Sequence, residues 1–394
     1  MCVERFLISA HLCVEGVIME YRQLGNTGTE VSVIGLGTEY LNKQSQKTVS
    51  SVVHTAIEGG VNLIDILFTF DAYLETLGNA LEGYRDDVLI QFHIGSGEYK
   101  GQYKKTRSIN TCKNLLDKSL SALNTSHVDI ANIHFVNTEK QYGDLLESGV
   151  VEYAHQLKEE GVARLVGMST HSVSAAMDAA SRGIVDVIMI QINLANNAMP
   201  GRNDMLATCA REGVGVLAMK PFAGGKLLQK NKKVHIGKYQ TGGVSLTKKI
   251  SPSITPVQCI NYVLSQMGVS SAMTGVKNVD ELQADLAYVK ANDQEKDFSG
   301  LLEDFQEYVS GECVYCNHCL PCPSSIDIGQ TIRLLDTVHH GLTPALQEQY
   351  EQLGARASDC TECGACVDRC PFEVAIIEKM KEAAALFESP QPKM

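Results

Sequence analysis

Eight of the thirteen cysteines lie in two short runs near the C-terminus. The runs read Cys313-x-x-Cys316-x-x-Cys319-x-x-Cys322-Pro323 and Cys360-x-x-Cys363-x-x-Cys366-x-x-x-Cys370-Pro371. Cysteines spaced three apart can turn their thiolates around one iron-sulfur cubane, while proline carries the last cysteine of each run toward the other cluster. The spacing therefore predicts two [4Fe-4S] clusters, one on Cys313, Cys316, Cys319 and Cys370 and one on Cys360, Cys363, Cys366 and Cys322.

Zinc is the alternative metal for these cysteine runs. Four-cysteine zinc sites usually use two separated Cys-x-x-Cys pairs, whereas both runs here are triplets closed by Cys-Pro, which favours iron. Eight cysteines already satisfy two clusters, so we interpret the nearby histidines as surface or packing residues: His318, His339 and His340. Three scattered cysteines in helical segments are interpreted as small buried side chains: Cys112, Cys209 and Cys259.

A second set of polar residues follows short apolar runs in the first three quarters of the chain. Such a residue taken alone is most often structural, but a common placement at the ends of strands predicts a shared site. The polar residues so placed are Asp65, His93, His134, Ser169, Thr170, Gln191 and Lys220, and Gly275 stands at the end of the eighth strand.

Short β-branched runs alternate with helical patterns from Glu20 to Val289. The predicted strands are Ser32–Leu36, Asn62–Ile66, Val88–Ile94, Val128–His134, Arg164–Ser169, Val185–Ile192, Gly215–Met219 and Ser271–Gly275. The predicted helices are Thr48–Glu58, Leu74–Leu81, Asn110–Leu123, Asp144–Glu160, Ser174–Ser181, Asp204–Arg211, Pro256–Met267 and Val279–Lys290.

Eight even strand-helix units predict an α/β fold of the TIM (β/α)8 barrel type, with an open doubly wound sheet as the weaker alternative. Residues 19–31 predict a hairpin across the barrel floor, and the glycine-rich loop Ala223–Ser253 predicts a lid over a ligand. We expect the barrel over residues 19–295 and a small ferredoxin-like iron-sulfur domain over residues 296–394. A helical pattern at Ile328–Leu353 is expected to pack that domain against the barrel, and residues 1–18 receive no function.

Composition excludes several classes of partner. The net charge of -12 argues against nucleic acid, and no apolar stretch is long enough to span a bilayer. Residues 1–18 lack the basic start and the cleavage site of a signal peptide, and clustered thiols favour a reducing compartment. We therefore expect a cytoplasmic protein that binds a small-molecule substrate. If its C-terminal domain passes electrons on, we also expect a redox partner protein. Its clusters should be damaged by oxygen.

Several sequence motifs resemble those of the aldo-keto reductases, specifically the branch that carries an iron-sulfur tail. Tyr21-Arg22-Gln23-Leu24-Gly25 and the segment 31–38 look like the opening of that family, and the segment 60–65 continues it. The segments 166–172, 215–221 and 275–278 extend the similarity across the barrel. The resemblance thus covers nearly the whole chain from Met19.

The resemblance implies a catalytic tetrad of aspartate, tyrosine, lysine and histidine, of which only half is present. Asp65 and His134 stand at the expected places, but the tyrosine position is Phe70 and the lysine position is His93. Since that lysine serves to lower the pKa of the tyrosine, the two losses are chemically consistent. If His93 meets Asp65, the carboxylate should favour the imidazolium and provide a new proton donor beside His134. The alternative is a barrel that has lost catalysis and kept its shape.

The resemblance also implies a nicotinamide site. Ser169, Thr170 and Gln191 would hold the nicotinamide amide, Gly275, Lys277 and Asn278 would cradle phosphate, and Lys220 would lie close by. Glu281 stands where many members carry an arginine for the 2′-phosphate, so NADH is preferred over NADPH. Clusters move single electrons and nicotinamide moves a hydride, so a flavin stays open as a bridge, although no flavin motif is present.

Two functions follow from these residues. The first is an iron-sulfur oxidoreductase of the aldo-keto reductase type, acting on a small carbonyl-like substrate with electrons relayed through two clusters. The second is a non-catalytic electron-transfer or docking subunit built on a degenerate barrel.

Overall fold

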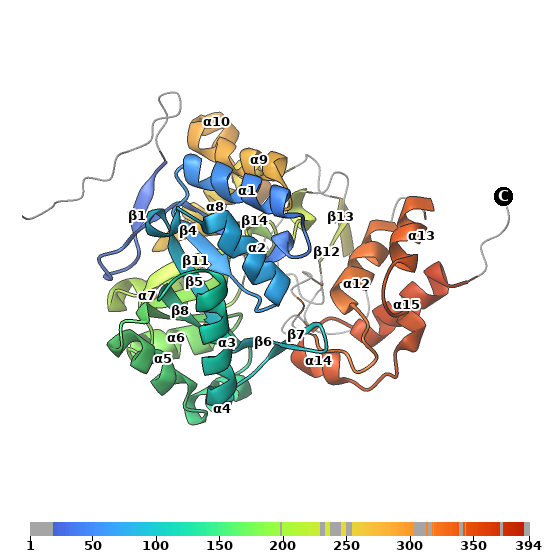
Figure 1. Ribbon diagram of the computed structural model, residues 1–394. Helices are drawn as coiled ribbons and strands as arrows, with labels where there is room; N and C mark the ends of the chain where they lie inside the picture. Colours follow the sequence, from blue (N-terminus) through green and yellow to red (C-terminus); the bar gives the residue numbers. More distant parts are fainter. Residues whose placement is uncertain are drawn as a thin grey trace, which may run out of the picture.

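The protein is described by a computed structural model over residues 19–197, 199–228, 233–236, 246–249, 254–302, 313, 317, 319–338, 342, 344–370 and 373–389. Within these ranges a barrel comes first and a smaller helical domain lies beside its mouth (Figure 1). No helix of the described residues has both the length and the apolar composition needed to cross a membrane.

The barrel consists of parallel strands in the closed order β10-β11-β14-β3-β4-β5-β8-β9, which confirms the predicted fold. The strands are buried on both faces, which explains why they are continuous apolar runs in the sequence. Their bounds are β3 Ile34–Gly37, β4 Leu63–Ile66, β5 Leu89–Ile94, β8 Val128–Val136, β9 Ala163–Thr170, β10 Val187–Gln191, β11 Gly215–Met219 and β14 Val269–Gly275.

Helices surround the barrel and mostly match the prediction. They are α1 Gln46–Glu58, α2 Asp71–Leu81, α3 Ile109–Ala122, α4 Glu139–Glu147, α5 Val150–Glu159, α6 Val173–Ser181, α7 Arg202–Glu212, α8 Pro256–Leu264 and α9 Val279–Lys290, followed by the short α10 Asp293–Lys296 and α11 Ser299–Leu302. The single helix predicted at Asp144–Glu160 is wrong, because Gly149 takes a left-handed φ of 77° and separates α4 from α5.

The predicted floor hairpin is confirmed. Strands β1 Tyr21–Gln23 and β2 Glu30–Ser32 pair antiparallel, and Leu24 between them is completely buried against the lower barrel interior. The Asn26 amide donates to the Gly213 carbonyl oxygen at 2.7 Å, just before β11 begins. The hairpin therefore closes the end of the barrel opposite the strand termini that bear the polar residues.

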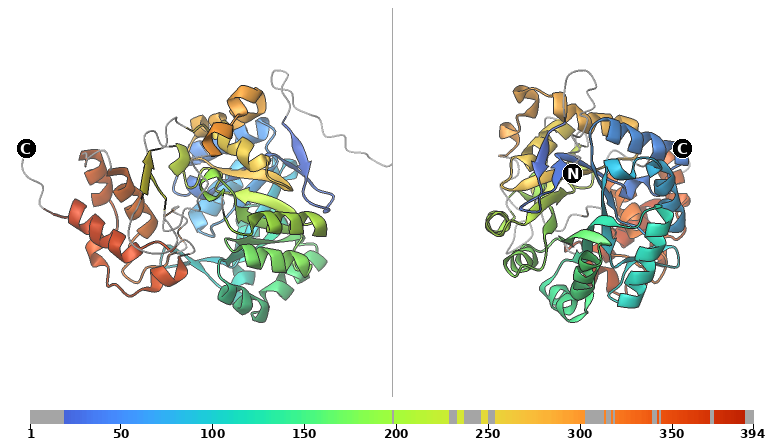
Figure 2. Two further views of the ribbon diagram at one scale, coloured as in Figure 1. Left: turned by 180° about the vertical axis from the view of Figure 1, so that it is seen from behind. Right: turned by 60° about the vertical axis from the view of Figure 1, so that its left-hand side comes forward.

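A second hairpin was not predicted. Strands β6 Ser96–Tyr99 and β7 Gln102–Lys105 pair antiparallel between β5 and α3. Lys100 and Gly101 have φ angles of 51° and 75°, as a tight two-residue hairpin turn requires. Figures 1 and 2 show this hairpin extending from the barrel toward the C-terminal domain.

The C-terminal domain has its own small core. Its described helices are α12 Ile328–Thr337, α13 Pro344–Glu351, α14 Ala365–Arg369 and α15 Ile376–Phe387, so the helical pattern at Ile328–Leu353 corresponds to α12 and α13. The rings of Tyr350 and Phe387 stack with centroids 4.3 Å apart, and Ile332 and Met380 are buried in the same core. The expectation that this region packs against the barrel is confirmed, because Asp336 of α12 pairs with Lys226 at 3.4 Å.

Most of the predicted lid, Ala223–Ser253, lies outside the described residues. The described parts are a 3-10 turn, η4 Lys226–Leu228, and the antiparallel strands β12 Lys233–Ile236 and β13 Leu246–Lys249. The other 3-10 turns of the described residues are η1 Glu39–Leu41, η2 Arg85–Asp87, η3 Leu194–Asn196 and η7 Ala357–Asp359.

Candidate active site and cluster sites

A cavity of about 420 Å³ opens at the carboxyl ends of the barrel strands. Strands that are distant in sequence each contribute a terminal side chain to its wall, as expected for this fold. Among the predicted site residues, those lining the cavity are Asp65, His93, His134, Ser169, Lys220, Gly275 and Lys277. The sequence prediction therefore identified much of the wall.

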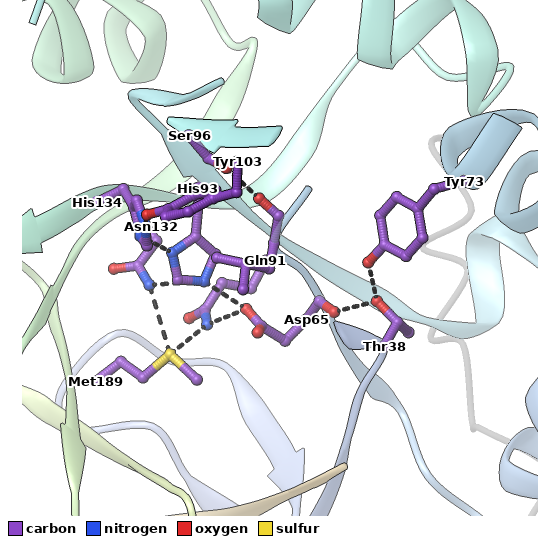
Figure 3. Close-up of polar contacts among 11 residues, drawn as sticks. Thr38, Asp65, Tyr73, Gln91, His93, Ser96, Tyr103, Asn132, His134 and Met189 are labelled. Atoms are coloured by element: carbon purple, nitrogen blue, oxygen red, sulfur yellow. Dashed lines mark hydrogen bonds and ion pairs between the residues drawn. The ribbon is translucent and has the colours of Figure 1, made fainter. Parts of the chain in front are cut away.

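Three of these residues form a buried hydrogen-bonded chain (Figure 3). His93 Nε2 lies 2.8 Å from Asp65 Oδ1, and His93 Nδ1 lies 2.7 Å from His134 Nδ1. His134 Nε2 is in turn hydrogen-bonded to the hydroxyl of Tyr103 on β7. The chain thus runs from Tyr103 through two histidines to a carboxylate on the cavity wall.

All hydrogen bonds of this chain can be formed in two arrangements, which differ by one proton. With both imidazoles neutral, Tyr103 donates to His134 Nε2, His134 Nδ1 donates to His93, and His93 Nε2 donates to Asp65. With one more proton, His93 donates from both nitrogens and His134 donates from Nε2 to the Tyr103 oxygen. Burial, reinforced by the charges of His93 and Arg107, holds the pKa of His134 well below its usual value, so His134 is neutral in both arrangements. The chain is therefore able to take up and release one proton.

The Asp65 carboxylate forms the cavity end of the chain. Its Oδ1 also accepts from the Gln91 side-chain amide at 2.6 Å. Its Oδ2 has no hydrogen-bond partner among the described residues, and the side chain is 11% exposed. The free oxygen is available to a ligand.

Phe70 and Tyr73 do not supply a phenol to this chain. Phe70 precedes α2 and packs against Phe68 with ring centroids 5.2 Å apart, while Tyr73 is hydrogen-bonded to Thr38. Burial also raises the pKa of Tyr73. The phenol comes instead from Tyr103, which sequence reasoning missed; the Lys100-Gly101 turn between two short strands is the signal that could have revealed its hairpin.

Only some of the residues predicted for a nicotinamide cofactor line the cavity. Thr170 donates its hydroxyl to the Val136 carbonyl oxygen, and neither Thr170 nor Gln191 lines the cavity. Asn278 Oδ1 accepts from the Glu281 amide at 2.9 Å as the N-cap of α9. Glu281 Oε2 accepts from the Lys277 amide at 2.8 Å, so a carboxylate of the chain itself occupies an amide expected to face phosphate.

Four cysteines from the two runs share one cavity in the C-terminal domain. Its wall contains Cys322, Cys360, Cys363 and Cys366, the set predicted for the second cluster. Among the described residues no group of three or more His, Cys, Asp or Glu side chains could hold a single metal ion. Donors of this kind and placement fit an iron-sulfur cluster.

The other predicted cluster is described only in part. Cys313, Cys319 and Cys370 lie in the described segments, whereas Cys316, like His318, His339 and His340, lies outside them. Arg369 donates to the carbonyl oxygens of Cys319 and Pro321 at 2.6 and 2.8 Å and thereby ties the two cysteine runs together. The scattered cysteines Cys112, Cys209 and Cys259 are buried, as predicted.

The unpredicted hairpin connects the two sites. The Gln102 side chain donates to the Cys322 carbonyl oxygen at 3.4 Å and accepts from the Cys322 amide at 3.3 Å. Successive side chains of a strand point to opposite faces, so the next residue, Tyr103, points to His134. Two adjacent residues of β7 therefore join a predicted cluster ligand to the cavity.

Comparison with known proteins agrees with this architecture. Residues 33–303 match the model of the aldo/keto reductase family, and residues 312–375 match that of a 4Fe-4S dicluster domain. The uncharacterized oxidoreductase YqkF of Bacillus subtilis is 24% identical over 290 residues, covering 69% of this chain and 92% of that protein. L-galactose dehydrogenase of Arabidopsis thaliana is 25% identical over 291 residues, covering 69% and 88%.

Solved structures show the same barrel. The holo form of the aldo-keto reductase AKR11C1 from Bacillus halodurans has a TM-score of 0.59 at 21% identity and covers 73% of this chain and 100% of that one. This likeness concerns the fold alone. The two family matches together support an iron-sulfur oxidoreductase. The chain belongs to the aldo/keto reductase family and carries a 4Fe-4S dicluster domain after its barrel.

Proposed function

We propose that the protein is an iron-sulfur oxidoreductase that acts on a small carbonyl-like substrate in the barrel cavity, with electrons relayed through two [4Fe-4S] clusters. The observation that carries this proposal is the continuous contact from Cys322 through Gln102 and Tyr103 to His134, His93 and Asp65. A barrel kept only as a scaffold has no need of such a connection.

The clusters, when bound, would supply electrons one at a time. Reducing a carbonyl to an alcohol also requires two protons, of which the side chains of the barrel are suited to deliver one and solvent would supply the other. Asp65 Oδ2 faces the cavity, and the two histidines behind it form a chain that can exchange one proton. Asp65, His93 and His134 are therefore the proposed catalytic residues, with Tyr103 positioning His134.

A dinucleotide is the proposed electron source only if it can bind beside these residues. Ser169, Gly275 and Lys277 line the cavity and support binding, but Glu281 occupies the Lys277 amide. Repulsion by that carboxylate would favour NADH over NADPH. The mismatch between hydride and single-electron chemistry leaves a flavin as a bridging cofactor to test for.

The experiment is an anaerobic titration of the cluster-replete protein with NADH and NADPH, followed by absorbance and electron paramagnetic resonance. Binding of NADH with cluster reduction would support an oxidoreductase that takes electrons from the dinucleotide and would call for a search for flavin. If neither nucleotide binds and dithionite still reduces the clusters, the electrons come from a redox partner protein, as the docking-subunit alternative also requires.

A further inference from the structure

Strand β8 contains a β-bulge where it delivers His134 to the cavity. The pairing of β8 with β9 shifts between Ile133 and Val136, because these residues lie three positions apart on β8 and their partners lie two apart on β9. Phe135, inside this interval, takes a left-handed φ of 67°. A bulge bends its strand and re-aims the neighbouring side chain. The direction of the His134 imidazole therefore depends on the geometry of this bulge.

Phe135 does not favour the conformation that the bulge requires. A bulky side chain in the left-handed region approaches its own backbone too closely, and such a position persists only where the surroundings impose it. The Phe135 ring is buried, with 2% of its surface exposed, and the Lys105 ammonium lies 4.2 Å from the ring centre. These contacts fix the side chain, so a further contact must hold the backbone.

Arg107, which follows β7, binds the backbone on both sides of the strained residue. Its Nη1 donates to the His134 carbonyl oxygen at 2.7 Å, and its Nη2 donates to the Phe135 carbonyl oxygen at 2.8 Å. These oxygens belong to the two peptide groups that flank Phe135. Because the guanidinium is planar and rigid, one side chain fixes the two peptide groups relative to each other.

The segment before Arg107 is shaped for this contact. The Thr106 amide donates to the Gly95 carbonyl oxygen at 2.8 Å, and Gly95 has a left-handed φ of 91°. A Cβ atom at Gly95 would lie 2.7 Å from the Thr106 carbonyl oxygen and 3.1 Å from Arg107 Nη1. The absence of a side chain at Gly95 therefore lets the end of the hairpin β6–β7 approach β8 closely enough for the guanidinium to reach the bulge.

We propose that Arg107 is a positioning residue for His134: its guanidinium holds the bulge at Phe135 and thereby keeps the imidazole between His93 and Tyr103. His134 Nδ1 lies 2.7 Å from His93 Nδ1, and His134 Nε2 is hydrogen-bonded to the Tyr103 hydroxyl (Figure 3). One segment of the hairpin thus supplies both a partner for the imidazole and the clamp for its backbone. The catalytic role of His134 rests on the proposed function, whereas its positioning by Arg107 does not.

The test separates the clamp from the charge of Arg107, because that charge also lowers the pKa of His134. Arg107→Lys keeps the charge, but an ammonium lacks the fork that binds two carbonyl oxygens in fixed geometry. Arg107→Met removes both the charge and the clamp. The other charged groups that lower the pKa of the imidazole, namely His93, Lys105 and Lys220, stay the same in every variant.

Arg85→Lys is the matched control. Arg85 also donates to two carbonyl oxygens, those of Val88 and His127 at 2.9 and 3.0 Å, but these residues precede β5 and β8 at the opposite end of the barrel. The full-length protein with oxidised clusters is labelled with 15N in its histidines. Magnetic resonance then follows the imidazole nitrogens between about pH 5 and 8, and His134→Gln identifies the signals of His134.

In the unaltered protein and in Arg85→Lys, His134 should stay neutral over the whole range, with two distinct nitrogens. In Arg107→Lys and Arg107→Met the imidazole should lose this fixed state and take up a proton with a pKa nearer to about 6.5, at a lower value in Arg107→Lys because its charge remains. Arg107→Lys decides the question if Arg107→Met does not fold.

The proposal is overturned if Arg107→Lys gives the His134 signals of the unaltered protein, since the charge alone would then act on the imidazole. It is also overturned if Arg85→Lys changes those signals as much as Arg107→Lys does, since a general loss of stability would explain both. The spectra require neither substrate nor electron transfer. A protein that keeps the clamp but shows no turnover would therefore refute only the proposed function.

Discussion

Tyr103 gives a chemical meaning to two substitutions in the barrel. Phe70 removes the phenol expected five residues after Asp65, and His93 replaces the expected lysine. In the folded protein His93 joins Asp65 to His134, while the Tyr103 hydroxyl reaches His134 from the other side. A phenol, two imidazoles and a carboxylate thus still lie together, as the family's tetrad would place its groups. The phenol comes from a different element, and the groups are connected in a different order.

The first prediction concerns the hydroxyl of Tyr103. Tyr103→Phe should lower the free energy of unfolding by about 1–3 kcal/mol, because it leaves the buried His134 Nε2 without its partner. Tyr99→Phe is the control, since Tyr99 lies on the same hairpin but is 48% exposed, and it should change stability by less than about 0.5 kcal/mol. Denaturant unfolding followed by circular dichroism measures both. Equal effects of the two substitutions would contradict the buried hydrogen bond.

The second prediction concerns stability against pH. Burial holds the pKa values of His134 and His171 well below about 6.5, so below that pH the unfolded chain binds protons that the folded chain excludes, and stability falls by about 1.4 kcal/mol per pH unit for each histidine. Asp285 acts in the opposite direction, because its pKa is raised to about 8. Between its unfolded value of about 3.9 and pH 8 the folded state holds the extra proton, so stability falls as pH rises.

The two histidines lower stability as pH falls below about 6.5, whereas Asp285 and Glu39, whose pKa burial also raises, lower stability as pH rises. Asp285→Asn should therefore make the decline on the alkaline side shallower and the decline on the acid side steeper, because the Asp285 carboxyl group opposes the histidines between about pH 3.9 and 6.5. Urea unfolding at several pH values measures the profile. An alkaline decline of unchanged slope in Asp285→Asn would contradict the contribution of Asp285.

At the scale of elements, short connecting segments bring the chemical groups together. The hairpin β6–β7 presents Gln102 to Cys322 and Tyr103 to His134. In the tail, Cys322 of the first cysteine run lies with Cys360, Cys363 and Cys366 of the second. The two runs are thus interleaved rather than side by side.

The interleaving of the two runs predicts which cysteines bind the same cluster. Cys322→Ser and Cys366→Ser should each cost the protein about four of about eight iron atoms, and the double variant should lose no more than either alone, because both line one cavity and are predicted to bind one cluster. Cys322→Ser combined with Cys370→Ser should lose nearly all the iron. Iron analysis and electron paramagnetic resonance after anaerobic reconstitution give the result. Independent losses from Cys322 and Cys366 would mean that each run holds its own cluster.

The barrel was predictable from the sequence because its physical causes are local. Strands buried on both faces are continuous apolar runs, as at Leu63–Ile66 and Gly215–Met219, and their ends converge, which brought Asp65, His93 and His134 together. The hairpin Ser96–Lys105 was not predictable in this way, because its strands are short and largely polar. The place of Tyr103 depends on the contact of Gln102 with Cys322, which is distant in sequence.

At the scale of the whole molecule, the C-terminal domain is part of the cavity. It docks through Lys226 and Asp336, lines the cavity with Arg333, and contacts the barrel hairpin at Cys322. A substrate in the barrel would therefore lie between the proton chain of one domain and a cation of the other. This arrangement predicts that neither domain alone carries out the reaction.

The most direct test of this account follows the reoxidation of the reduced protein. The cluster-replete chain is reduced anaerobically with a stoichiometric amount of dithionite and mixed with pyruvate or 2-oxoglutarate, and the cluster absorbance is recorded with time for the unaltered protein, Tyr103→Phe and Tyr99→Phe. The account predicts that the absorbance recovers with formation of the hydroxy acid, more slowly in Tyr103→Phe and at the normal rate in Tyr99→Phe. Clusters that stay reduced with both carbonyl compounds and are reoxidised only by a partner protein would contradict it.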